Sequence, residues 1–231
     1  LKSYLGGLTD DLNTGYYPKS GEVTGYLEFY FDFDSDTSGT ISHGVSTSPE
    51  TLQSSYDDIS SGKNLVGTLA GNDSATDHKD WSTEFVGWDG SSPEEVVRSW
   101  FSEIDDAAVA WSLGDIPTDP DGNPVSAVYV TAEGRDYRQL LDKLLRVGIA
   151  YSQTADDYLD NDVDGKGLLA DHSKVADGKN YTALEHAWDE GFGYFGGARN
   201  YGAWSNDERV TSYVDTDGDG SIDLLTEKAW H

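Results

Sequence analysis

Hydrophobic positions between residues 92 and 113 recur every three or four residues, which is the spacing of one face of an α-helix. The segment opens with Ser92, Pro93 and Glu95, the pattern of an N-cap, a first-turn proline and a capping box. We therefore predict a helix over 92–113 with one buried face. The residues of that face are Val97, Trp100, Phe101, Ile104, Ala108 and Trp111.

The same spacing predicts a second long helix over 134–160, with small residues at 148, 152 and 155 that would let another helix approach closely. A third helix is expected to begin at Thr182, where Thr-Ala-Leu-Glu matches a capping box, and to end among the glycines at 191–197. We expect Trp188 of this helix to face the core. Weaker patterns predict a helix over 1–12 and a short one from Leu224.

The stretches 13–91 and 161–180 are rich in Gly, Ser, Asp and Thr and are predicted to be loops. Within and beyond them, segments 25–34 and 125–131 carry the aromatic and β-branched residues of short strands, which suggests one β-hairpin. The pattern as a whole predicts a mainly α fold. It would be a helical bundle of one domain over 1–231, with long acidic loops.

The composition supports a folded chain with a strong negative charge. Hydrophobic residues make up 36% and aromatic residues 12% of the 231 residues, which is enough for a core. Fifteen Lys and Arg against 43 Asp and Glu give a net charge of −28. This charge excludes nucleic acid and anionic membranes as partners and favours divalent cations, although adaptation to high salt produces the same imbalance.

The residue types also limit the ligands and the location. The chain has no Cys, so a metal must be held by oxygen or imidazole. No apolar run is long enough for a transmembrane segment. Because the chain has no Met, even at position 1, we expect it to be cut from a longer precursor. Because Trp230-His231 follows a helix-like segment without a stop signal, we also expect the native chain to continue beyond His231.

The segment 215–223, Asp-Thr-Asp-Gly-Asp-Gly-Ser-Ile-Asp, has the spacing of a calcium-binding loop. Alternating aspartates turn their carboxylates toward one centre, and Gly220 permits the sharp turn. Glu227 lies one residue beyond the usual last ligand position, and the alternative is an acidic turn without an ion. The predicted calcium ligands are Asp215, Asp217, Asp219, the Ser221 carbonyl, Asp223 and Glu227.

Two other stretches share part of this spacing. Asp160, Asp162 and Asp164 precede Gly165, with Asp171 at the last ligand position, but a solvated helix end explains them equally well. Asp32, Asp34 and Asp36 lack the glycine, which favours an acidic strand edge.

A helix over the third segment would bring His186, Asp189 and Glu190 together at spacings of three and four. These side chains could hold a metal ion or relay a proton. The alternative is structural, with Glu185 completing the capping box and His186 bonded to a carboxylate. The glycines that follow allow a ligand or another backbone to come close.

The run His-Ala-Trp-Asp-Glu-Gly-Phe-Gly-Tyr-Phe-Gly over 186–196, together with the aspartate loop, resembles an uncharacterised family of exported bacterial proteins that is similar to the imelysin-like proteins. The resemblance implies helical bundles, a periplasmic or cell-surface location, lipoprotein anchoring through a missing N-terminus, and a role in iron acquisition. Some imelysin-like proteins are classed as peptidases on a G-x-H-x-x-E motif. Here His186 and Asp189 keep the spacing, while Asp replaces Glu and Leu184 replaces the glycine.

Three functions are therefore considered. The first is an exported, non-enzymatic metal-binding protein with a calcium loop and a second site for iron or another metal. The second is a metal-dependent hydrolase in which Glu190 acts as base and His172 or Glu103 supplies a third ligand. The third is a surface module whose aromatic residues bind a sugar or a protein partner.

Overall fold

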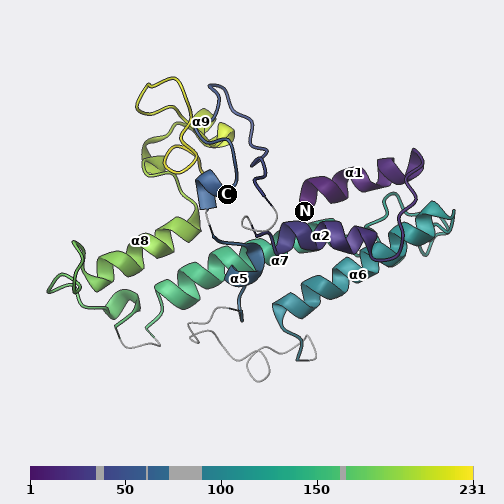
Figure 1. Ribbon diagram of the computed structural model, residues 1–231, viewed down its shortest axis with the longest axis horizontal. Coiled ribbons are helices and arrows are strands. Elements are labelled where there is room, and N and C mark those ends of the chain that lie inside the picture. The colour runs from purple at the N-terminus through teal and green to yellow at the C-terminus, as the bar shows by residue number, and fades with distance from the viewer. Residues whose placement is uncertain (35–38, 61, 73–89, 162–164, 231) are drawn as a thin grey trace. The chain divides into compact units, whose positions relative to one another are not determined.

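The computed structural model describes residues 1–34, 39–60, 62–72, 90–161 and 165–230 (Figure 1). Helices make up 47% of the structure, and no strand or sheet forms in the described ranges. The prediction of a mainly α, bundle-like fold is therefore confirmed. Within the same ranges, no helix is both long enough and apolar enough to cross a membrane.

The contacts between residues divide the chain into two compact units. Unit 1 comprises Leu1–Phe33 and Asn64–Ile149, and unit 2 comprises Asp34–Lys63 and Ala150–His231. Each unit is therefore made from two separate stretches of sequence. The assignment of 1–231 to a single domain stays a prediction.

Unit 1 is built around helix α6 (Pro93–Ser112), which contacts α1 (Lys2–Asn13), α2 (Glu22–Phe31) and α7 (Tyr137–Leu145). Short α5 (Leu65–Thr68) completes its helices. The side chain of Ser92 accepts from the Glu95 N–H and Glu95 accepts from the Ser92 N–H, so the predicted capping box is confirmed. The buried residues of α6 include Val97, Phe101, Ile104, Ala108 and Trp111, as predicted.

The segment predicted as a strand, 25–34, is instead helical, because α2 spans Glu22–Phe31. Val23, Leu27 and Phe31 are fully buried and lie four residues apart, so one helical face packs on α6. Packing has overridden the β propensity of the aromatic residues. Residues 125–131 form turns rather than a strand, so the predicted hairpin is wrong.

The start of α2 is fixed by a side chain from α6. Asp105 is 3% exposed, and its carboxylate accepts hydrogen bonds from the N–H groups of Gly21 (2.7 Å), Val23 (2.9 Å) and Thr24 (3.1 Å). Gly21 adopts φ 85°, a left-handed conformation that favours glycine. The unpaired N–H groups of the first turn thus find their acceptor on another helix.

The predicted second long helix is observed, but its second half is a π-helix. The chain passes from α7 into η1 (Arg146–Tyr158), which contributes residues to both units. At Gly148 a Cβ would meet the Leu69 side chain at 2.9 Å, and the Gly148 carbonyl accepts from the Ala70 N–H at 2.8 Å. The small residue therefore admits a crossing segment of chain, although not a long helix.

Unit 2 contains α4 (Asp57–Ser60), η2 (Gly167–Leu169), α8 (Ala183–Phe195), η3 (Tyr201–Ala203) and α9 (Asn206–Thr211). The predicted start and end of α8 are confirmed, with a capping box between Thr182 and Glu185 and a left-handed Gly196 after the last turn. Two other predictions are wrong. Trp188 is 56% exposed rather than in the core, and residues from Leu224 form one turn rather than a helix.

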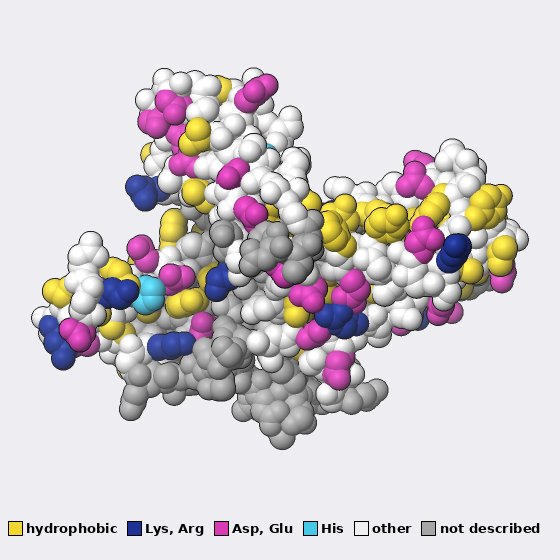
Figure 2. Space-filling view, in the orientation of Figure 1, with side chains coloured by type: hydrophobic (Ala, Val, Ile, Leu, Met, Phe, Trp, Pro, Cys, Tyr) yellow, Lys and Arg dark blue, Asp and Glu magenta, His cyan; other side chains and the backbone are white. Residues whose placement is uncertain are grey.

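The surface reflects the charge of the chain. Acidic side chains outnumber basic ones on the face that Figure 2 shows. Because basic residues are few, most carboxylates need partners other than cations, and backbone N–H groups are the available donors.

We predict that Asp105→Ala lowers the free energy of unfolding by about 3 kcal/mol, because three N–H groups at the start of α2 lose a charged acceptor. Urea unfolding followed by circular dichroism measures the change. Asp106→Ala, at the exposed neighbouring position, is the matched control and should change stability by less than about 0.5 kcal/mol. Equal effects of the two substitutions would contradict the role of Asp105.

Candidate functional site

The aspartate loop of unit 2 is closed at its base by backbone hydrogen bonds. The Val214 N–H donates to the Glu227 carbonyl at 3.1 Å, and Tyr213 pairs with Lys228 in an isolated bridge. Ile222 is fully buried and exchanges backbone hydrogen bonds with residues 50 and 52, which anchors the loop.

Within the loop, each aspartate accepts hydrogen bonds from N–H groups a few residues ahead. Asp215 accepts from Gly218 (2.7 Å) and Gly220 (3.1 Å), and Asp217 accepts from Asp219 (3.0 Å). Gly218 and Gly220 adopt φ 75° and 88°, which explains why the turn needs glycine at both positions. These bonds hold the chain in a tight curve around the carboxylates.

The buried side chain of Glu227 links the two ends of the loop through hydrogen bonds. It is 3% exposed, and its Oε1 accepts from the Thr216 N–H (2.6 Å), the Thr216 hydroxyl (2.7 Å) and the Asp217 N–H (3.3 Å). Its Oε2 accepts from the Asp223 N–H at 3.0 Å. Burial raises the pKa of Glu227, but the hydrogen bonds from Asp223 and Thr216 outweigh it and hold the pKa below the ordinary value of 4.5.

Asp215, Asp217 and Glu227 form the candidate metal centre. Each offers a carboxylate oxygen, and these oxygens all lie within 4.8 Å of one another. Hard cations such as Ca²⁺ prefer oxygen ligands of this kind. A divalent ion between them would also remove the mutual repulsion of three carboxylates.

Asp219 and Asp223 do not belong to this group of three carboxylates, and the Ser221 carbonyl stays a predicted ligand. Asp219 accepts from the N–H and the hydroxyl of Ser221 at 2.8 and 2.6 Å. Asp223 accepts from Gln53 Nε2 (2.8 Å), the Leu225 N–H (2.9 Å) and the Thr226 hydroxyl (2.8 Å). The carboxylate of Asp223 therefore has structural partners.

Sequence reasoning missed Gln53, which lies 170 residues before Asp223. Its Nε2 donates to Asp223, and its Oε1 accepts from the Leu224 N–H at 2.8 Å, so its amide ties two neighbouring residues to one side chain. Gln53 lies in a stretch that the composition predicts as loop, and no local pattern singles it out.

The second predicted metal site has weaker geometry. His186 Nδ1 lies 3.9 Å from Glu190 Oε1, both side chains are about half exposed, and the His186 ring stacks on Tyr181 at 5.1 Å. Among the described residues, His186, Asp189 and Glu190 belong to no group of three metal ligands. Glu185 completes the capping box, as the structural alternative expected.

The proposed third ligands have other partners. His172 Nδ1 lies 2.9 Å from the Thr182 hydroxyl, while Glu103, in unit 1, accepts a hydrogen bond from the Tyr137 hydroxyl. Of the weaker acidic stretches, Asp36, Asp162 and Asp164 lie outside the described residues. The transition-metal site and the additional calcium sites stay predictions.

The comparisons with known proteins place the chain in one family. Residues 68–228 match the model of the family described as a domain of unknown function, DUF4856, and the chain belongs to that family. No curated protein and no solved structure matches the chain. The export and the similarity to imelysin-like proteins that the sequence suggested stay predictions.

We predict that Glu227→Gln destabilises the calcium-free protein by about 2 kcal/mol at pH 7, because an amide cannot accept all four hydrogen bonds. The pKa of Glu227 in the folded protein lies below its value in the unfolded chain. The difference in free energy of unfolding between wild type and Glu227→Gln is therefore full above about pH 4.5 and is lost as the pH falls through the folded-state pKa.

Urea unfolding of both proteins between pH 7 and pH 3, in the presence of a chelator, measures this difference. Glu50→Gln, at an exposed position in the same unit, is the control and should leave the difference from wild type near zero across the range. A Glu227→Gln effect that stays constant down to pH 3 would contradict the assignment.

Proposed function

We propose that the protein is a non-enzymatic calcium-binding protein in which the ion stabilises the loop 215–227. The observation that carries the proposal is the convergence of oxygens from Asp215, Asp217 and Glu227 to within 4.8 Å of one another on a glycine turn. Carbonyl groups of the loop and water would complete the coordination that Ca²⁺ requires.

The geometry favours calcium over a softer metal. The three side chains supply only carboxylate oxygen, no imidazole belongs to the group, and the chain has no thiolate. Ca²⁺ accepts carboxylates in flexible geometry, whereas Zn²⁺ and iron favour sites that include nitrogen or sulfur.

An exported location is part of the proposal. Loops with few charged ligands bind calcium weakly and suit the high calcium concentration outside the cytoplasm. The resemblance of 186–196 to the imelysin-like proteins supports the same location.

A role in metal acquisition or hydrolysis would require the second site. His186 and Glu190 supply one loose pair of side chains for that site, at 3.9 Å, and both are exposed. The calcium-binding function therefore has the better support from geometry.

We predict that saturating calcium raises the melting temperature and the free energy of unfolding, by about 2.7 kcal/mol when the free ion is 100 times its dissociation constant. Native mass spectrometry should show one bound calcium ion that a chelator removes. Asp215→Asn combined with Asp217→Asn should abolish both effects, because the group keeps a single carboxylate.

The matched control is Asp207→Asn, which removes an exposed carboxylate at the start of α9 and should leave calcium binding unchanged. A melting temperature that is the same with calcium and with chelator, together with a protein mass that contains no calcium, would overturn the proposed function.

A further inference from the structure

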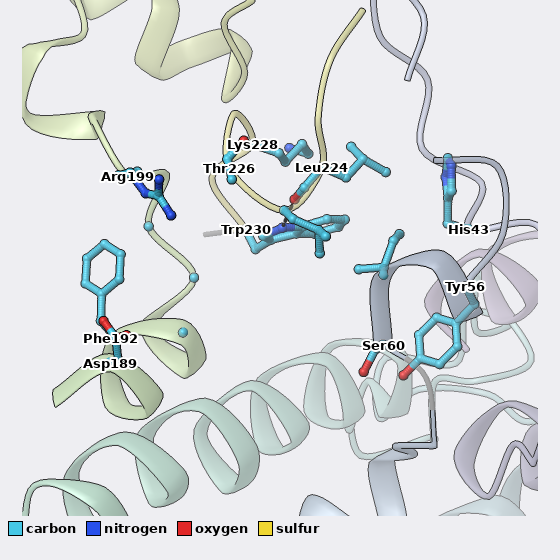
Figure 3. A pocket seen from close by; sticks show the side chains of 15 residues that line it. His43, Tyr56, Ser60, Asp189, Phe192, Arg199, Leu224, Thr226, Lys228 and Trp230 are labelled. Atoms are coloured by element: carbon cyan, nitrogen blue, oxygen red, sulfur yellow. Dashed lines mark hydrogen bonds between the residues drawn. The ribbon is translucent and has the colours of Figure 1, made fainter. Parts of the chain in front are cut away.

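Unit 2 contains a cavity of about 720 Å³ that the calcium site does not use. Its walls come from the end of α8, from residues 224–230 and from segment 43–60 (Figure 3). Cavities of this size hold small organic ligands in other proteins.

Two basic residues line this cavity in a chain that has few of them. The side chains of Arg199 and Lys228 both belong to the lining, and Asp189 is the acidic residue there. Within the described residues, the Arg199 guanidinium forms no hydrogen bond or ion pair. Its positive charge interacts electrostatically with the Asp223 carboxylate and helps to lower the pKa of that group. In a protein with a net charge of −28, an exposed arginine whose guanidinium N–H groups form no hydrogen bond or ion pair within the described residues is available to a ligand.

Lys228 is held in place rather than paired with an acid. Its Nζ donates to the Ser212 hydroxyl (2.7 Å) and the Ala229 carbonyl (3.1 Å) and lies 5.4 Å from the centre of the Trp230 ring. These two hydrogen bonds fix the amino group of Lys228 at the cavity wall.

Aromatic rings flank the charged groups. Phe192 is 39% exposed and Trp230 is 42% exposed, and both line the cavity. Figure 3 shows Arg199 and Phe192 on one side of Trp230, with His43, Tyr56 and Ser60 on the other. Large exposed rings beside an unpaired guanidinium suit a ligand with a flat apolar body.

Both ring nitrogens of His43 have partners within the protein. Its Nδ1 accepts from the Val45 N–H at 2.9 Å, and its Nε2 lies 2.9 Å from the Gln53 carbonyl. The nitrogens of His43 are therefore engaged and do not anchor the ligand.

Gly196, just after α8, and Gly193, in its last turn, also line the cavity. At Gly196 a Cβ would meet Trp230 Cβ at 3.1 Å, and the Trp230 N–H donates to the Gly196 carbonyl at 2.8 Å. A Cβ at Gly193 would meet no atom within 4 Å. The first glycine admits the neighbouring chain, and the second leaves the cavity open.

We propose that this cavity binds a small organic anion with an aromatic body, whose acidic group pairs with Arg199 and whose ring packs against Phe192 and Trp230. The planar guanidinium matches a carboxylate through two parallel hydrogen bonds. A neutral amide of the same shape cannot form this pair. The inference goes beyond the calcium site and does not depend on an ion being bound.

The test compares 2-naphthoate with 2-naphthamide, which share one ring system and differ in charge. Binding to the full chain is measured by isothermal titration calorimetry and by ligand-observed NMR in calcium-containing buffer. Naphthoate should bind at least about tenfold more tightly than naphthamide. Equal binding of the two compounds, or no binding of naphthoate, would overturn the proposal.

Two variants locate the site. Arg199→Gln should weaken naphthoate binding about tenfold or more and leave naphthamide unchanged, because the ring contacts remain. Gly193→Leu should block both compounds by filling the open space, and it also favours the helix. The control is Arg135→Gln, which makes the same change of charge in unit 1 and should alter neither affinity.

Circular dichroism and melting temperature confirm that each variant is folded. Naphthoate binding that Arg199→Gln and Gly193→Leu both leave intact would place the ligand elsewhere and reject this cavity as the site.

Discussion

A carboxylate turned inward onto backbone N–H groups is the interaction on which both units depend. In unit 1, Asp105 accepts three N–H groups at the start of α2, and in unit 2, Glu227 accepts from both ends of the aspartate loop. Each of these side chains is 3% exposed. A buried carboxylate without hydrogen-bond donors would be strongly destabilising. The backbone segments that supply the donors must therefore pack around the carboxylate.

This interaction also explains how so acidic a chain folds. The 15 Lys and Arg residues are too few to pair with all 43 Asp and Glu residues. Helix starts and tight turns, however, leave backbone N–H groups unpaired, and a carboxylate can accept hydrogen bonds from these groups. Capping boxes at Ser92, Thr182 and Ser205 use glutamates in this way. At these positions, negative charge also lies near the positive end of the helix dipole.

The range of each interaction along the chain decides how much the sequence could predict. The sequence predicts helices α6 and α8 with nearly correct ends, because the residues that form their caps and buried faces lie close together in the chain. The local pattern predicts a strand in place of helix α2, because the acceptor that starts the helix, Asp105, lies 82 residues from Val23. For the site, spacing identified the aspartates, but the partnership of Asp223 with Gln53 spans 170 residues and has no local signal.

The loop and the cavity share one segment of chain. Thr226 and Lys228, which line the cavity, are the immediate neighbours of Glu227, whose oxygens fix the loop. Glu227 ends the turn that begins at Leu224, and Lys228 follows it directly, so one short segment presents a carboxylate to the loop and a cation to the cavity. An interaction that orders Glu227 therefore also restrains Lys228. If an ion and an organic anion both bind this segment, each must change the affinity of the other by the same factor, since the coupling between two sites is reciprocal.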